Sequence, residues 1–288
     1  MTRRVPGAAA LALLLAGCTG PSLLSKIDRV AGGGAGTRRV ADGLAFGTHG
    51  QKLDIWAPKG KAATPRPVVI FFYGGGWVDG TRGGYAFAGR AFARNGFVTV
   101  VPDYRKVPDV RFPAFVEDGA QAVAWVRAHI ADYDGDPGRI ALVGHSAGAY
   151  ITAMLALDRQ FLNDAGVPDG TVKAAVGLSG PYDFLPFTDK RAVDALGHWP
   201  DPKQTQPISY ARADAPPMML VTSGKDTVVK PRNAVALAKR LEALGVRTEF
   251  HDYPGLSHEG VVMALSKPFR GKAPVLADTV RFLKMHMK

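Results

Sequence analysis

The chain has 288 residues, of which 47% are hydrophobic and 21% are charged, a composition typical of a globular protein with enough apolar material for a buried core. Its net charge of +11 raises the question of nucleic-acid binding, but the lysines and arginines are scattered, without basic runs or interleaved aromatic residues. We therefore expect no nucleic-acid partner. The single cysteine, Cys18, excludes an intramolecular disulfide.

The amino-terminal segment has the features of an export signal. Two arginines near the start precede an apolar stretch over residues 8–16, which is too short to span a bilayer. Leu15-Ala16-Gly17-Cys18 resembles the lipobox of bacterial lipoproteins, in which the cysteine is acylated and becomes the first mature residue. The sequence thus predicts a signal peptide over residues 1–17 and an exported lipoprotein, anchored to the membrane of the bacterial cell envelope through Cys18. The alternative is a plain secretory signal followed by an unrelated cysteine.

Residues 18–37 contain a cluster of glycines between positions 32 and 36. No strand pattern precedes these glycines, so they predict a flexible tether rather than a dinucleotide-binding loop. No internal repeat follows, and we expect residues 38–288 to form one domain.

Strand and helix patterns alternate through most of this domain. Residues 44–47 and 51–56 read as short antiparallel edge strands, and residues 67–72 form an apolar run typical of a strand buried on both faces. The alternation predicts a doubly wound α/β fold, with a mostly parallel central sheet and helices on both faces. It breaks down at residues 183–213, which predict a small cap-like insertion. Further strands are predicted over residues 97–101, 139–143, 172–178, 218–222 and 248–253, and helices over 85–95, 114–132, 149–157, 232–244 and 275–285.

A Gly-x-Ser-x-Gly motif follows the strand predicted over residues 139–143. A serine on a sharp strand-to-helix turn needs neighbours without bulk two positions to either side, and Gly144 and Gly148 meet this demand. The apolar segment that follows has helical length. Ser146 is therefore predicted to be a nucleophile at a helix N-terminus, with the N–H of Ala147 able to stabilise a developing anion.

A run of three glycines, Gly74 to Gly76, directly follows the buried strand predicted over residues 67–72. Ligand sites in α/β sheets gather at the carboxyl ends of strands, and glycines let backbone N–H groups approach a substrate oxygen. Three glycines exceed what a tight turn requires, so this loop is predicted to form an oxyanion hole.

A serine nucleophile needs a base, and the base needs a carboxylate to orient it. Among seven histidines, His258 lies in a loop directly after a predicted core strand. Asp226 follows the strand predicted over residues 218–222 and completes the chain order Ser, Asp, His. Asp183 also follows a strand and is the rival candidate for the acid.

These motifs together resemble α/β-hydrolase carboxylesterases of the hormone-sensitive-lipase-like kind. The resemblance is carried by Gly-Gly-Gly-Trp after a strand, Asp103-Tyr104-Arg105 with Phe112-Pro113-Ala114 downstream, Gly-His-Ser-Ala-Gly, and the loops of Asp226 and His258. It covers the chain from about Val40 onward. One departure is Tyr73, where such proteins often carry histidine.

The resemblance implies an α/β-hydrolase fold and a serine hydrolase. Ser146, Asp226 and His258 would form its catalytic triad. Gly75 and Gly76 would complete the oxyanion hole with Ala147. Trp77 and His145 are assigned to the substrate pocket.

The expected reaction is hydrolysis of a small-molecule carboxylic ester through an acyl-enzyme, with no metal or organic cofactor. An amidase or arylformamidase on the same triad is one alternative. A non-catalytic binding lipoprotein on a hydrolase scaffold is another. The sequence leaves the acyl length, the membrane leaflet and the oligomeric state open.

Overall fold

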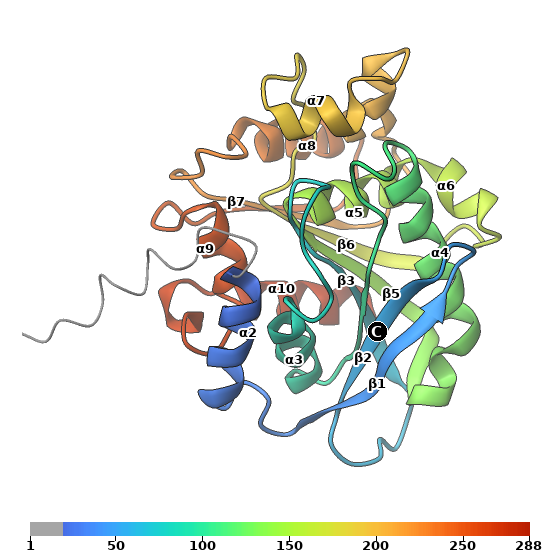
Figure 1. The fold of residues 1–288 in the computed structure, drawn as a ribbon, viewed down its shortest axis with the longest axis vertical. Helices are drawn as coiled ribbons and strands as arrows, with labels where there is room; N and C mark the ends of the chain where they lie inside the picture. The colour runs from blue at the N-terminus through green and yellow to red at the C-terminus, as the bar shows by residue number, and fades with distance from the viewer. Residues whose placement is uncertain (1–19) are drawn as a thin grey trace, which may run out of the picture.

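The computed structural model describes residues 20–288, so the predicted signal peptide and Cys18 lie outside the described residues. Eight strands form one sheet in the spatial order β1-β2-β4-β3-β5-β6-β7-β8, and helices cover both of its faces (Figure 1). The strands are β1 (Thr37–Phe46), β2 (Gln51–Pro58), β3 (Arg66–Phe72), β4 (Val98–Pro102), β5 (Gly135–His145), β6 (Val172–Leu178), β7 (Met218–Thr222) and β8 (Thr248–Asp252).

The sheet is mostly parallel. All neighbouring strands from β4 to β8 in the spatial order run parallel, whereas β2 is antiparallel to both β1 and β4. Each of the central strands β3, β5, β6 and β7 ends in a run of buried residues, because helices cover both faces there. The predicted α/β fold is confirmed, and the strands predicted over residues 172–178 and 218–222 have the predicted bounds.

The helices pack on the sheet through small and apolar side chains. Alanines at positions 149, 153 and 156 of α5 join Leu237 and Leu241 of α8 in one buried cluster, while α3 and α10 lie on the other face (Figure 1). No helix within residues 20–288 combines the length and apolar character that a membrane span needs. The α-helices are α2 (Gly20–Val30), α3 (Ala86–Arg94), α4 (Ala114–His129), α5 (Ala147–Leu157), α6 (Arg159–Asp164), α7 (Lys190–Leu196), α8 (Arg232–Ala243), α9 (His258–Met263) and α10 (Val275–His286), with short 3₁₀ helices η2 (Ile130–Tyr133), η3 (Pro202–Thr205), η4 (Pro207–Tyr210) and η5 (Arg270–Lys272).

The segment that follows Cys18 differs from the predicted flexible tether. From Gly20 onward it forms helix α2, which lies against α3 and α9 (Figure 1). The guanidinium of Arg90 in α3 donates to Asp28 Oδ2 over 2.8 Å, and both side chains are buried. The glycines are a tight turn and not a linker, because a Cβ on Gly33 would stand 2.2 Å from Asp28 Oδ1. Long-range contacts of this kind cannot be read from composition.

Asp28→Ala tests whether α2 is an integral part of the domain. The substitution leaves the Arg90 guanidinium buried without its counter-charge, and we expect the free energy of unfolding to fall by about 3–5 kcal/mol. Urea unfolding followed by circular dichroism measures this change. Arg29→Ala on the exposed side of the same helix is the control and should change stability by less than about 0.5 kcal/mol. Equal effects of the two substitutions would contradict a structural role for the pair.

Candidate active site

Ser146 lies on the predicted turn between β5 and α5. Its backbone has φ 55° and ψ −121°, a conformation that L-residues rarely adopt. The two flanking glycines make this turn possible: a Cβ on Gly144 would stand 2.1 Å from the carbonyl oxygen of Gly148, and a Cβ on Gly148 would stand 2.0 Å from that of Phe72. The turn therefore presents Ser146 at the N-terminus of an 11-residue helix whose first N–H belongs to Ala147.

The glycine loop after β3 packs directly against this turn. A Cβ on Gly74 would stand 3.0 Å from the Cβ of Ser146, so the loop and the serine are in close contact. Gly75 and Gly76 have φ of 140° and 61°, and the carbonyl of Gly75 accepts hydrogen bonds from Val78 and Asp79. The sequence-predicted oxyanion loop and nucleophile are thus neighbours at the carboxyl ends of β3 and β5.

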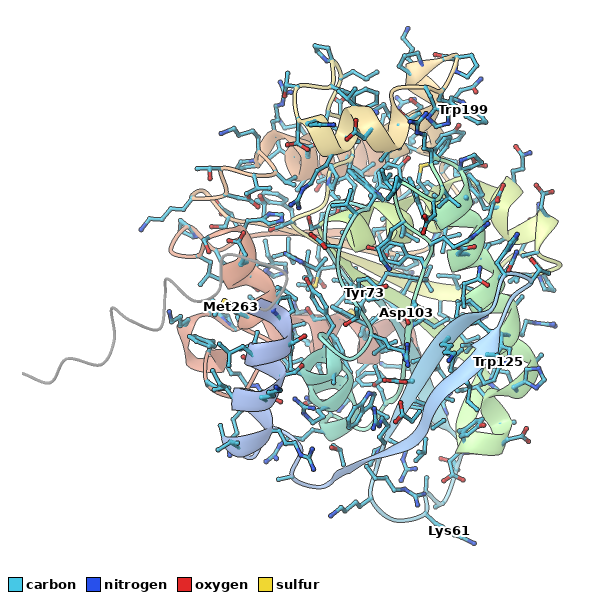
Figure 2. The ribbon with its side chains drawn as sticks, in the orientation of Figure 1. Lys61, Tyr73, Asp103, Trp125, Trp199 and Met263 are labelled. Carbon is cyan, nitrogen blue, oxygen red and sulfur yellow. The ribbon has the colours of Figure 1, made fainter. Side chains whose placement is uncertain are left out.

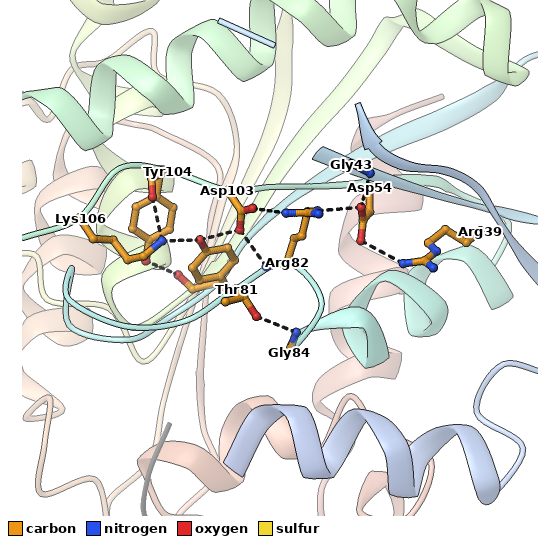
Figure 3. A network of polar contacts seen from close by, with 10 residues as sticks. Arg39, Gly43, Asp54, Thr81, Arg82, Gly84, Asp103, Tyr104 and Lys106 are labelled. Carbon is orange, nitrogen blue, oxygen red and sulfur yellow. Dashed lines mark hydrogen bonds and ion pairs between the residues drawn. The ribbon is translucent and has the colours of Figure 1, made fainter. Parts of the chain in front are cut away.

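Tyr73 anchors the start of this loop. Its hydroxyl donates to Asp103 Oδ1 over 2.9 Å and accepts from Lys106 Nζ over 3.0 Å. Burial raises the pKa of the phenol well above its ordinary value and so keeps it protonated as a donor. Asp103 continues the network to Arg82 and, through it, to Asp54 in β2 (Figure 3). The network ties the start of the glycine loop to the sheet.

Asp226 and His258 meet as the sequence predicted. His258 Nδ1 donates to Asp226 Oδ2 over 2.8 Å, and both side chains are buried. Burial alone would raise the pKa of Asp226, but the hydrogen bond and charge of His258 and the amide of Val229 hold it below its ordinary value. Because the carboxylate can only accept, His258 carries its proton on Nδ1, and Nε2 is free to act as a base.

The buried ring of His145 contacts the backbone of His258. Its Nε2 lies 3.1 Å from the carbonyl oxygen of His258, which can only accept, so Nε2 carries the proton. Burial and the neighbouring His258 lower the pKa of His145 to about 3, which keeps the ring neutral. The side chain is 3% exposed and fixes the backbone of His258. This role depends on a contact across 113 residues that no local pattern reveals, and the assignment of His145 to the substrate pocket stays a prediction.

The surroundings of His145 include the amino-terminal helix. Pro21 and Leu24 of α2 line a small cavity of 60 Å³ together with His145 and Met263 of α9 (Figure 2). Helix α2 thus lies close to the buried ring of His145.

The insertion at residues 183–213 packs over the glycine loop. The ring of Phe184 stacks on Trp77 at a centroid distance of 6.4 Å, and Trp77 contacts Tyr150 edge-on at 5.3 Å. The side chain of Arg191 in α7 lies close to Gly76, because a Cβ on this glycine would stand 2.7 Å from the Cδ of Arg191. Trp77 is 4% exposed, so its assignment to a substrate pocket stays a prediction, as does the role of the insertion as a cap.

The rival acid, Asp183, lies apart from this arrangement. Its side chain is exposed at the start of the insertion, and its backbone N–H donates to Asn233. Within residues 20–288, no group of three or more His, Cys, Asp or Glu side chains is placed to hold a metal ion.

A family model described as BD-FAE matches residues 53–241, which is well over half of the chain. The chain belongs to the BD-FAE family. The matched region of this BD-FAE member includes Ser146, the glycine loop and Asp226, and it ends before His258.

Curated relatives of this BD-FAE member are named as esterases. Esterase LipC of Mycobacterium tuberculosis (strain ATCC 25618 / H37Rv) is 33% identical over 230 residues, covering 72% of this chain and 56% of the relative. A protein of the same strain named "probable carboxylic ester hydrolase LipM" is 30% identical over 218 residues, covering 69% of this chain and 51% of the relative. The chain therefore spans about half the length of these relatives.

Solved structures share the fold. An esterase from Pyrobaculum calidifontis superposes with a TM-score of 0.74 at 22% identity, covering 98% of this chain and 100% of that one. The esterase Est22 superposes with a TM-score of 0.75 at 18% identity, covering 97% and 90%. These likenesses and the family match confirm the predicted α/β-hydrolase fold and the carboxylesterase family.

The buried His145 makes stability depend on pH. The folded chain takes up this proton only near pH 3, whereas the ordinary pKa is 6.5, so between these values the unfolded state binds more protons. The free energy of unfolding should therefore fall as the pH decreases from 6.5 toward 3, with His145 contributing up to about 1.4 kcal/mol per pH unit. Urea unfolding at several pH values in this window should give a shallower slope for His145→Gln. The exposed His49→Gln is the control, and an unchanged slope in His145→Gln would contradict the assignment.

Proposed function

We propose that this BD-FAE member is a serine carboxylesterase that hydrolyses a small-molecule ester through an acyl-enzyme formed on Ser146. The observation that carries the proposal is the buried hydrogen bond between Asp226 and His258, beside a serine held at a strained turn. The esterase names of the relatives LipC and LipM support the same reaction class.

In the proposed first step, the Oγ of Ser146 attacks the ester carbonyl while Nε2 of His258 takes its proton. A serine hydroxyl is a weak nucleophile without such a base. Asp226 holds the imidazole with Nδ1 protonated and stabilises the imidazolium that forms. The carbonyl of His258 is fixed by His145, so the ring is oriented before substrate arrives.

In the same step, negative charge develops on the former carbonyl oxygen. The N–H of Ala147 at the start of α5 and those of Gly75 and Gly76 would donate to this oxygen, and the positive end of the helix dipole adds to the stabilisation. Collapse of the tetrahedral intermediate breaks the bond to the alkoxy group, which leaves as the alcohol with the proton held by His258. Water, activated by the same histidine, then releases the acid and restores Ser146. The residues described supply every proton transfer.

Substitution of the triad tests this mechanism. Ser146→Ala removes the nucleophile and Asp226→Asn disturbs the tautomer of His258, and each should lower kcat for p-nitrophenyl acetate about ten-thousand-fold. A fluorophosphonate probe should label the wild type and not Ser146→Ala. Steady-state kinetics and intact-protein mass spectrometry provide the readouts.

The controls use residues of the same type outside the site. Ser209→Ala at an exposed position and Asp183→Asn at the rival acid should leave kcat/KM unchanged. Equal hydrolysis by wild type and Ser146→Ala, or a larger loss in Asp183→Asn than in Asp226→Asn, would overturn the assignment. Faster turnover of formylated aromatic amines than of esters would assign an amidase, and absence of both labelling and turnover would assign a binding protein.

We also propose that the protein is exported and anchored to the membrane of the bacterial cell envelope through acyl chains on Cys18. The support is the sequence Leu15 to Cys18 after a charged start and an apolar stretch. Two or more acyl chains would give stable attachment, whereas one chain would bind only marginally.

Cys18→Ser tests the anchor. Expressed with its own leader in a bacterial host, the wild type should incorporate radiolabelled palmitate and sediment with membranes. Cys18→Ser should lose the label and should no longer sediment with membranes. Membrane association of Cys18→Ser equal to that of the wild type would contradict the proposal.

A further inference from the structure

A cavity of 550 Å³ lies between α4, α6 and the insertion. None of Ser146, Asp226 and His258 lines it, so it is separate from the proposed ester site. Its volume lies in the range of small-molecule sites, which are roughly 300–1,000 Å³. Trp199 enters the cavity from the insertion, in the upper part of the view above α4 (Figure 2). The proposed esterase reaction gives this cavity no role.

Three aromatic rings from separate parts of the chain form a corner in this cavity. Trp199 meets Phe112 at a centroid distance of 5.0 Å with the ring planes 88° apart, and Phe161 of α6 meets Phe112 at 6.3 Å and 75°. The indole N–H of Trp199 donates to Gln204 over 2.9 Å, which fixes the ring. These rings form an aromatic wall of the cavity, and a cation that approaches the face of such a ring is attracted to it.

The charged side chains that line the cavity are all acidic. Glu117, Asp158 and Asp164 line it, and no lysine or arginine does, although the chain contains 36 basic residues. Among residues 20–288, none of these three carboxylates forms an ion pair. The cavity is therefore an acidic site on a basic protein.

Asp158 is the most enclosed of the three carboxylates. It caps α6 by accepting from the N–H of Gln160, and it is half-buried. Burial raises its pKa above the ordinary value, and the nearby Asp164 carboxylate acts in the same direction, whereas the amide of Gln160 and the guanidinium of Arg212 act against them. A cation in the cavity would offset both effects, because an opposite charge nearby favours the ionised carboxylate.

We propose that this cavity binds a small organic cation of the quaternary ammonium class, held by its aromatic wall of Phe112, Phe161 and Trp199 and by the charge of the lining carboxylates. Aromatic faces attract a cation electrostatically, and alkyl groups on the nitrogen would contact the same rings. The site is distinct from the proposed ester site, so the cation binds without being a substrate.

Isothermal titration calorimetry with choline and 3,3-dimethylbutan-1-ol tests the proposal. The alcohol has the shape of choline with carbon in place of the charged nitrogen. We expect saturable binding of choline and at least about tenfold weaker binding of the alcohol. No binding of choline, or equal binding of the two, overturns the proposal.

Two variants and two further measurements locate the site. Asp158→Asn preserves helix capping while removing the charge, and Trp199→Ala opens the aromatic corner. Each should weaken choline binding at least about threefold. Urea unfolding would show that both variants are folded, and Asp158→Asn should hydrolyse p-nitrophenyl acetate like the wild type.

Ser146→Ala should bind choline like the wild type, which separates this proposal from the esterase proposal. Choline that competes with p-nitrophenyl acetate would place it in the ester site and overturn the inference. Binding of neutral xylose tighter than that of choline would assign the cavity to carbohydrate instead.

Discussion

The close approach of three backbone segments at Ser146 is the constraint on which the rest of the site depends. The end of β3, the end of β5 and the first turn of α5 come so near one another that neither Gly144 nor Gly148 has room for a Cβ. The strained φ of Ser146 persists because these contacts determine it. A larger residue at either glycine would separate the glycine loop from the serine, and the helix N-terminus would no longer face the same point.

Buried groups hold the parts that surround this turn. Tyr73 and Asp103 fix the glycine loop from the side of β2, and His145 fixes the backbone of His258. Each interaction joins two segments that lie far apart in the chain, and each uses an uncharged donor that burial keeps in one protonation state. Buried side chains therefore hold the glycine loop and His258 in place, in addition to any contact from the exposed insertion.

The sequence predicted those elements whose signal is local. The bounds of β6 and β7 followed from their apolar runs, because a strand that is buried on both faces reads as a nearly continuous apolar run in the sequence. Ser146, Asp226 and His258 were found from their positions after strands, and the structure brings Asp226 and His258 into contact. The parts that were missed depend on distant partners.

Helix α2 and the support from His145 are the two examples. The glycines at positions 32–36 suggest a linker, and only the contact of Gly33 with Asp28 shows that they form a turn. The strand β1 is likewise longer than predicted, since an edge strand with exposed residues carries a weak pattern. The composition of a segment gives no information about its distant partners, and each of these features depends on a contact between two segments.

The contact between Asp28 and the amide of Lys267 joins residues 239 positions apart. At a synthesis rate of roughly 5–20 residues per second, the amino-terminal helix would leave the ribosome roughly 10–50 s before this partner exists. During that interval the helix can pair with α3 but cannot close over α9, where His258 lies. Helix α2 is thus synthesised well before it can dock against α9. The contacts of α2 on this side of His145 are completed only when Asp28 meets Lys267, near the other end of the described chain.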